Sequence, residues 1–327
     1  MNLQIVDVKY RVESDRLSFP PIAAPTIRGN LGYVLRDICC ELEDPDSECA
    51  SCQGRGICPY EHFFAPKADC EAKGIKVENA PRPFIIEAEG LDGQSYREGD
   101  TFDFKLVLIG AFGRDVEFFA KVFEAMGDRG FGKDNSPCQL LEMSRRIGTR
   151  DYSAREDNDG KPEKSAVIVD VEKACDIVLT EDSNASREMM AVDFMTPFRF
   201  KYRSALQEEL PFHVLVRTLL RRITLLETFY GDGEPEIDHR ELIKEAERVE
   251  VISSHLKKNT SRRISGRQKR SISMNGLKGR IIYEGCVEKW LPLLGCGQFL
   301  HVGKSTTMGL GRYEVTWPLE VVQWKGD

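Results

Sequence analysis

The sequence predicts an α+β protein made of two tandem ferredoxin-like (RRM-like) domains, and three observations favour this fold class. A segment with helical apolar spacing, a glycine-rich loop and a strand-like segment follow one another twice, near the middle of the chain and at its end. Segments with strand-like alternation precede each of these runs. The 327 residues, 41% hydrophobic and 30% charged, suffice for two separate cores. We therefore expect one domain over residues 1–185 and a second over 186–327.

The first domain is expected to begin with a strand over residues 3–12, where apolar side chains largely alternate. A helix follows, because Ile27, Leu31 and Ile38 share one helical face with Val34 and Leu35. The other expected elements are strands at 84–87 and 102–109, a helix at 114–126, a glycine-rich loop at 126–133 and a strand at 138–144. This β-α-β-β-α-β order is the ferredoxin-like one. Residues 167–171 and 177–180 further predict a hairpin.

The second domain repeats this order after a polar boundary at 181–190. A helix over 211–230 opens with Pro211, a favoured first-turn residue, and buries one apolar face. Its opposite side carries His213, Arg217 and Arg221 in a single stripe. The other expected elements are a strand at 195–202, a short polar helix at 238–249, a basic hairpin, a strand at 280–287, a helix at 288–300 and a final strand from Tyr313.

The composition is that of an ordinary globular protein. No apolar run approaches the ~20 residues of a membrane span, and the first residues lack the basic region of a signal peptide. We therefore expect a cytoplasmic protein with no membrane partner. In that compartment the ten cysteines would be reduced or bound to metal instead of paired in disulfides.

The net charge of −7 at first argues against a nucleic-acid partner, but its distribution argues for one. Residues 251–283 contain nine Lys and Arg residues and no Asp or Glu. A basic segment on an acidic body concentrates the binding of a polyanion at one place. The alternative is a solvated loop, which does not account for nine unopposed charges. The segment therefore predicts a nucleic-acid contact surface, shaped as a hairpin with its turn near residues 265–267.

The second glycine-rich loop follows the helix at 288–300 and brings Gly303, Lys304, Gly309, Gly311 and Arg312 together. Glycine allows a backbone to come close to a ligand, so N–H groups of this loop can point at an anion. A nucleotide-binding P-loop is excluded on two grounds. Residue 298, where its first glycine belongs, is Gln, and only one strand and a tail follow the loop.

Four cysteines predict a metal site in an insertion over about residues 40–70. Cys40, Cys49, Cys52 and Cys58 have the spacing C-x8-C-x2-C-x5-C. Cys39 falls on the buried helical face and is expected in the core. Four thiolates around zinc would stabilise a segment that has little core of its own. Structural zinc is the first expectation, and an iron–sulfur cluster or reduced thiols without metal are the alternatives.

Three segments carry a resemblance to a known family. They are Thr196–Tyr202, Leu219–Leu226 and the glycine-rich stretch Leu300–Gly311, with further points at Leu291–Gly295, Ile27–Gly32 and Cys58–Tyr60. Together with tandem ferredoxin-like domains and a basic hairpin, they resemble the RAMP superfamily of CRISPR proteins. Within it, the chain is most similar to the endoribonuclease that cuts precursor CRISPR RNA within its repeats. The likeness is strong over 195–316 and looser before it.

The resemblance implies RNA cleavage without a catalytic metal. In this family a ribose 2′-hydroxyl attacks the neighbouring phosphate and leaves a cyclic phosphate and a 5′-hydroxyl. The reaction needs a base, an acid and cations for the phosphorane charge. The resemblance and the basic segment imply RNA contacts at these residues: Gly303, Lys304, Gly309, Gly311, Arg312, Arg199, Lys201, Arg28, Arg262, Arg263, Arg267, Lys269 and Arg270.

Histidine suits this proton transfer because its pKa lies near neutrality, and the chain has five histidines. His301 is the first candidate because it stands beside the glycine-rich loop and Lys304; the alternative is a histidine packed at a helix end. His62 is the second, since relatives carry a catalytic histidine in the first domain, within or just after its first helix. That helix holds no histidine here, so Tyr33 is the third candidate. His239 is expected to be inert in an acidic, exposed stretch.

Two other functions compete with the endoribonuclease. One is a non-catalytic RAMP subunit that binds guide RNA, the CRISPR RNA (crRNA), beside other CRISPR effector subunits. The other is a zinc-stabilised RNA-binding module unrelated to CRISPR. Cleavage of repeat RNA in the presence of a chelator separates the enzyme from both.

Overall fold

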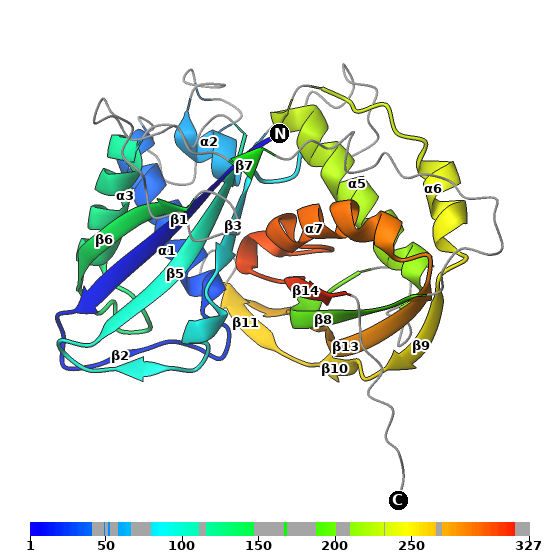
Figure 1. Cartoon of the computed structure of the whole chain (residues 1–327). Coiled ribbons are helices and arrows are strands. Elements are labelled where there is room, and N and C mark those ends of the chain that lie inside the picture. The colour runs from blue at the N-terminus through cyan, green and yellow to red at the C-terminus, as the bar shows by residue number, and fades with distance from the viewer. Residues whose placement is uncertain are drawn as a thin grey trace, which may run out of the picture. The chain divides into compact units, whose positions relative to one another are not determined.

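The computed structural model describes residues 1–40, 49, 52, 58–66, 80–110, 116–146, 167–168, 188–200, 210–231, 233–265 and 270–317. The chain divides into two compact units. Unit 1 comprises Met1–Val169, Leu225–Gly233 and Thr307–Gly309, and unit 2 comprises Asp170–Thr224, Glu234–Thr306 and Leu310–Asp327. Each unit combines helices with an antiparallel sheet, which confirms the predicted α+β class with two domains (Figure 1).

The sheet of unit 1 has the strand order β3-β5-β1-β6, with every pair antiparallel. Its strands are β1 (Asn2–Val12), β3 (Phe84–Glu87), β5 (Thr101–Ile109) and β6 (Cys138–Arg146), and a small separate sheet pairs β2 (Leu17–Ser18) with β4 (Ser95–Tyr96). The helices are α1 (Ala24–Cys39), α2 (Pro59–Phe64), α3 (Val116–Arg129) and the short 3-10 helix η2 (Glu89–Leu91). The β1-α1-β3-β5-α3-β6 order is the one that the sequence predicts.

Aromatic side chains fill the core of unit 1. Tyr10 of β1 is buried, its ring lies 5.5 Å from that of Phe102 and 4.9 Å from that of Phe131, and its hydroxyl donates to the carbonyl of Phe123 over 2.7 Å. That hydrogen bond satisfies a polar group which would be costly to bury alone. Gly127 lies against the carbonyl of Cys138, where a Cβ atom would collide, so α3 packs closely on the sheet. The first unit therefore has its own core.

One local prediction for unit 1 was wrong, and another is described only in part. Ile38 is 48% exposed, because α1 ends at Cys39 and its last turn extends past the buried face. The hairpin expected of residues 167–171 and 177–180 stays a prediction. Val167–Ile168 form β7, which pairs with Asn2 and Leu3 of β1. Residues 177–180 lie outside the described residues.

The sheet of unit 2 has the equivalent order, β10-β13-β8-β14, and is antiparallel as well. Its strands are β8 (Glu188–Phe198), β9 (Glu250–Ser254), β10 (Lys257–Asn259), β13 (Gly276–Gly285) and β14 (Tyr313–Thr316), with β9 also paired to β13. A separate hairpin joins β11 (Arg262–Ser265) and β12 (Arg270–Ser273). The helices of this part of the chain are α5 (Phe212–Tyr230), α6 (His239–Ala246), α7 (Leu291–Leu300) and the 3-10 helices η4 (Glu288–Trp290) and η5 (Thr306–Met308). The last turns of α5, from Leu225, and most of η5 belong to unit 1.

In unit 2, α5 and α7 cover one face of the sheet, and α6 lies beside α5 (Figure 1). The ring of Phe212 lies 5.0 Å from that of Tyr283 and 5.4 Å from that of Trp290, and all three are buried. Gly297 of α7 leaves room for the hydroxyl of Tyr313, which donates to the carbonyl of Leu294 over 2.7 Å. This close contact fixes the end of α7, where the glycine-rich loop begins.

None of the helices in the described ranges has the length and apolar character required of a membrane span.

Candidate functional site

The glycine-rich loop connects α7 to β14, and its backbone conformation is fixed by residues with positive φ and by close contacts. His301, Gly303, Ser305, Gly309 and Gly311 all have positive φ. A Cβ at position 303 would lie 2.5 Å from the carbonyl oxygen of Arg199, and one at 311 would collide with the carbonyl of Val302. The loop therefore needs glycine at these places for backbone conformation and for close packing.

Hydrogen bonds inside unit 2 use several N–H groups of this loop. Those of Val302, Lys304 and Gly311 donate to backbone carbonyls, and that of Arg312 donates to the hydroxyl of Thr196 over 2.9 Å. The expectation that the loop as a whole presents its N–H groups to an anion was therefore too broad. Among the described residues, no acceptor takes the N–H of Gly303 or Ser305. These two donors can meet an anion.

His301 lies at the start of the loop and is fully buried, with 0% of its surface exposed. Its Nδ1 lies 3.2 Å from the carbonyl oxygen of Leu310. A carbonyl can only accept, so this hydrogen bond requires a proton on Nδ1. The geometry is that of the helix-end histidine named above as the alternative. Its catalytic role stays a prediction.

Arg222 of α5 was not predicted, and it holds the same helix end. Its Nε donates to the carbonyl of Leu300 over 2.6 Å, and burial lowers its pKa to about 10. Its Nη2 is buried without a hydrogen-bond partner in the described part of the chain. The sequence does contain a signal for it. Arg222 falls between Leu219 and Leu226 on the apolar face of the helix, where a cation must find a partner.

Arg199 connects the loop to the basic hairpin. Its guanidinium donates to the carbonyl of Ser273, at the end of β12, over 2.6 Å. Its own carbonyl accepts from the N–H of Lys304 over 2.8 Å. Arg312 at the other end of the loop pairs with Glu314 at 3.1 Å. Unit 2 thus gathers Arg199, Lys304 and Arg312 around one loop, as the sequence predicts, whereas Lys201 lies outside the described residues.

The hairpin β11–β12 forms where the acid-free segment predicts it. Arg262 pairs with Ser273 and is exposed, and Ser265 pairs with Arg270 at the far end. The side chains of Arg263 and Arg270, and the whole of Arg267 and Lys269, lie outside what the structure describes. Behind the hairpin, Lys257 of β10 stands directly opposite Lys278 of β13. Two like charges at such a cross-strand position repel each other, and a polyanion would relieve this repulsion.

The candidate residues of unit 1 differ in how easily they can be reached. Tyr33 of α1 is 49% exposed, and the guanidinium of Arg129 lies 4.5 Å above its ring and 3.5 Å from the carboxylate of Asp37. His62 of α2 is half-buried, and burial lowers its pKa to about 4, with Glu61 opposing the shift. Arg28 lies over the ring of Phe64 at 4.9 Å. The sequence contains no signal that Arg129 lies next to Tyr33.

The cysteines of the predicted metal site are free thiols. Burial, and then the neighbouring Cys58, raise the pKa of Cys39 to about 11, and the same two causes raise the pKa of Cys49. The Sγ of Cys58 lies 4.0 Å from the carbonyl of Cys39. Thiols that influence one another in this way suit a shared metal, yet among the described residues no group of three or more His, Cys, Asp or Glu has the arrangement of a ligand set. Zinc therefore stays a prediction.

Comparison with protein families gives two matches along the chain. Residues 192–313 match the family described as CRISPR-associated endoribonuclease Cas6, and residues 1–158 match a family described as an N-terminal domain. The first match covers β8, α5, the basic hairpin and the glycine-rich loop. No protein among the curated sequences matches.

Solved structures with this fold include Cas6 proteins. A partial Cas6-RT-Cas1–Cas2 complex matches with a TM-score of 0.55 and 14% identity, over 96% of this chain and 46% of that one. The full Cas6-RT-Cas1–Cas2 complex gives the same TM-score over 29% of its chain, so this chain spans less than half the length of both. A product complex of a Thermus thermophilus Cas6 matches with a TM-score of 0.53 and 15% identity, over 96% of this chain and 99% of that one.

The match over 192–313 falls on the loop, helix and hairpin that build the candidate site, and the two-unit fold extends the likeness to nearly the whole chain. Residues 192–313 of the chain therefore match the Cas6 family of CRISPR-associated endoribonucleases, and the chain shares its fold with solved Cas6 proteins.

Proposed function

We propose that this protein cleaves precursor CRISPR RNA within its repeats to give mature guide RNAs, without a catalytic metal. The 2′-hydroxyl of one ribose attacks the adjacent phosphate and leaves a cyclic phosphate and a 5′-hydroxyl. The observation that supports this most is that the Cas6 match coincides with the glycine-rich loop and its cations. There Lys304, Arg199 and Arg312 stand beside the N–H groups of Gly303 and Ser305. Such fixed donors stabilise a phosphorane.

The acid–base group is best assigned by asking which of the three candidate side chains the RNA can reach. His301 is fully buried, so it requires the loop to open. His62, with a pKa of about 4, is neutral at pH 7, so it could accept a proton but is a poor donor to the leaving oxygen, and it is half-buried. Tyr33 is exposed and has the cation of Arg129 over its ring. We therefore place Tyr33 first, ahead of the two histidines.

Single-turnover cleavage of labelled repeat RNA in EDTA tests both the function and the residue. The wild type should cut at an unchanged rate in the chelator, and Tyr33→Phe should slow cleavage by about 100-fold with little change in RNA affinity. His62→Ala and His301→Ala complete the set. Normal cleavage by Tyr33→Phe together with slow cleavage by folded His301→Ala would return the role to His301 and imply that the loop opens.

The burial of His301 also favours a second function, that of a subunit which binds guide RNA without cutting it, beside other CRISPR effector subunits. The same experiment decides between the two. RNA that stays intact after incubation with the wild type, while binding to it tightly, supports the binding subunit.

We further propose structural zinc on the cysteines of the insertion, held by Cys40, Cys49, Cys52 and Cys58. The spacing of the four cysteines supports this proposal, and so does the closeness of Cys49 to Cys58 and Cys40, whose charges act on its thiol. No catalytic step uses this metal.

A further inference from the structure

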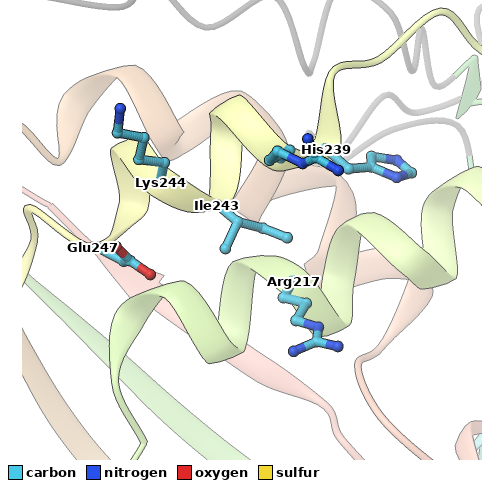
Figure 2. Close-up of a pocket in the computed structure, with 6 residues that line it drawn as sticks. Arg217, His239, Ile243, Lys244 and Glu247 are labelled. Atoms are coloured by element: carbon cyan, nitrogen blue, oxygen red, sulfur yellow. The ribbon is translucent and has the colours of Figure 1, made fainter.

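A groove between α5 and α6 lies apart from the glycine-rich loop and the basic hairpin of unit 2. It has a volume of about 460 Å³. Its lining residues are Arg217 of α5 together with His239, Arg240, Ile243, Lys244 and Glu247 of α6 and its C-terminal end. Figure 2 shows Ile243 between the two helices, with the charged side chains around it.

The residues that line the groove carry a net positive charge, because Arg217, Arg240 and Lys244 outnumber Glu247. Arg217, Arg240 and Lys244 are exposed, and none of the three has an ion pair with another described residue. Glu247 is the single acid of the lining. Arg221 continues the cationic stripe one turn further along α5. Cations that gather without a partner attract an anion to that place.

The shape of the groove is fixed because α6 is capped and is held against α5. The Nε2 of His239 lies 2.8 Å from the hydroxyl oxygen of Thr224, which ties the first turn of α6 to α5. Asp238 caps α6 by accepting from the N–H groups of Arg240 and Glu241 at 3.0 Å each. Leu242 and Ala246 are buried. His239, which the sequence predicts to be inert and exposed, is thus half-buried and helps to fix the groove.

We propose that the α5–α6 groove binds the phosphate backbone of a single-stranded segment of the RNA, outside the segment that is cut. The proposal rests on the proposed function. Arg217 and Arg240 can donate to phosphate in a planar fork, and Lys244 adds a point charge. An acidic protein partner is less well matched, because a protein interface needs an apolar or aromatic centre and the groove offers only Ile243.

The groove lies on the helical face of the sheet of unit 2. Tyr283 of β13 faces α5, whereas Arg280, on the alternate face of the same strand, is exposed and pairs with Asp193 on β8. The groove lies on the helical side, opposite to Arg280. An RNA segment bound in the groove would therefore lie on the face of the sheet opposite to Arg280.

The test uses the full chain and two labelled RNAs, a minimal repeat and the same repeat with a single-stranded extension. Arg217→Ala/Arg240→Ala should weaken binding of the extended RNA by about 10-fold and flatten its log–log salt dependence by about 1.4, at about 0.7 for each lost phosphate contact. Binding of the minimal repeat and the single-turnover rate at saturating RNA should not change. Arg11→Ala/Lys121→Ala removes two exposed cations of unit 1 and serves as the charge-matched control.

Four results would overturn the proposal. Equal salt slopes for the wild type and the double variant on the extended RNA would show that no phosphate sits in the groove. An equal loss of affinity for the minimal repeat would place the groove within the repeat-binding site. A lower single-turnover cleavage rate at saturating RNA would assign these arginines to catalysis. Polyglutamate that competes with the extended RNA for the wild type, but not for the double variant, would identify an acidic protein partner instead.

A failure of the proposed function is distinguishable from these results. If the wild type binds both RNAs but cuts neither, the endoribonuclease proposal fails, while the salt slopes still report on the groove. Circular dichroism and urea unfolding of the double variant check its fold. Both arginines are exposed, so their removal should leave stability unchanged.

Discussion

His301 ends α7 in a backbone conformation that a residue with a Cβ atom rarely adopts. Its φ is 53°, its side chain is buried, and its ring bonds to Leu310 across the loop. A strained backbone persists only where the surroundings hold it. The ring therefore acts as an internal support of the glycine-rich loop in this structure.

This supporting role predicts a loss of stability in His301→Ala. The substitution leaves the buried carbonyl of Leu310 without its donor and should lower the free energy of unfolding by about 1–3 kcal/mol. Urea unfolding measures it, and His255→Ala, at an exposed position, is the matched control. Equal stabilities of the two variants would contradict the role and would leave His301 to catalysis.

His62 predicts a dependence of stability on pH. Its pKa is about 4 in the folded chain because of burial, against 6.5 for an ordinary histidine, so between these values the unfolded chain binds the extra proton. Stability is therefore full above pH 6.5 and falls as the pH drops towards 4. With allowance for partial exposure, the loss is about 2 kcal/mol.

Urea unfolding at pH 7.5, 6 and 5 measures this dependence, and His62→Gln, which does not titrate, is the comparison. The difference in stability between wild type and variant should shrink as the pH falls. A difference that stays constant over this range would mean that His62 titrates normally in the folded chain.

At the scale of elements, the basic hairpin β11–β12 predicts a salt effect on RNA binding. Arg262→Ala/Arg263→Ala/Arg267→Ala should flatten the log–log salt slope by about 2 if each arginine meets a phosphate. Arg280→Ala is the control, because its guanidinium is already held by Asp193 at 2.7 and 2.8 Å. An unchanged slope in the triple variant would remove the hairpin from the RNA-binding surface.

Most elements could be predicted from the sequence because each has a one-sided apolar pattern. The alternation of β1 and β5 and the helical faces of α1 and α5 match their burial. Boundaries were less predictable. β8 begins at Glu188, inside the stretch predicted as a polar boundary. Pairing with Gly285 and Glu284 of β13 stabilises the start of this strand, which the local sequence alone does not predict.

The candidate site was harder to predict because its contacts join distant parts of the sequence. The loop glycines could be named from composition, but the bond from Arg199 to Ser273 and the burial of His301 depend on tertiary packing. For the same reason the sequence placed His301 ahead of Tyr33. Accessibility, which reverses that order in our proposal, has no local signature in either residue.

At the scale of the whole molecule, the proposed zinc site predicts the metal content of the protein. Freshly prepared, unchelated protein should contain about one zinc per chain, and Cys49→Ser should lower the metal content and the stability of unit 1. RNA binding by the basic hairpin of unit 2 should be retained. Elemental analysis decides the matter. Neither zinc nor iron in such a preparation would rule out the metal, whereas a brown colour with iron would favour the cluster.

The two units repeat one strand order, but they use their helix-to-strand loops differently. In unit 1, Asn30 of α1 donates to the carbonyls of Met126 and Gly130, which closes the first glycine-rich loop around a buried amide. In unit 2 the corresponding loop carries Lys304 and Arg312. The first loop therefore belongs to the core of its unit, and the second is the one available to a ligand.

The hydrogen bonds within the second loop have a consequence for the rate of RNA binding. Because Val302, Lys304, Gly311 and Arg312 are already bonded, the loop has little conformational entropy left to lose when a phosphate arrives. Encounter should then be limited by diffusion and by the attraction of charges, with no slow ordering step. Stopped-flow traces of RNA association should accordingly remain single-exponential, with a rate that increases linearly with protein concentration.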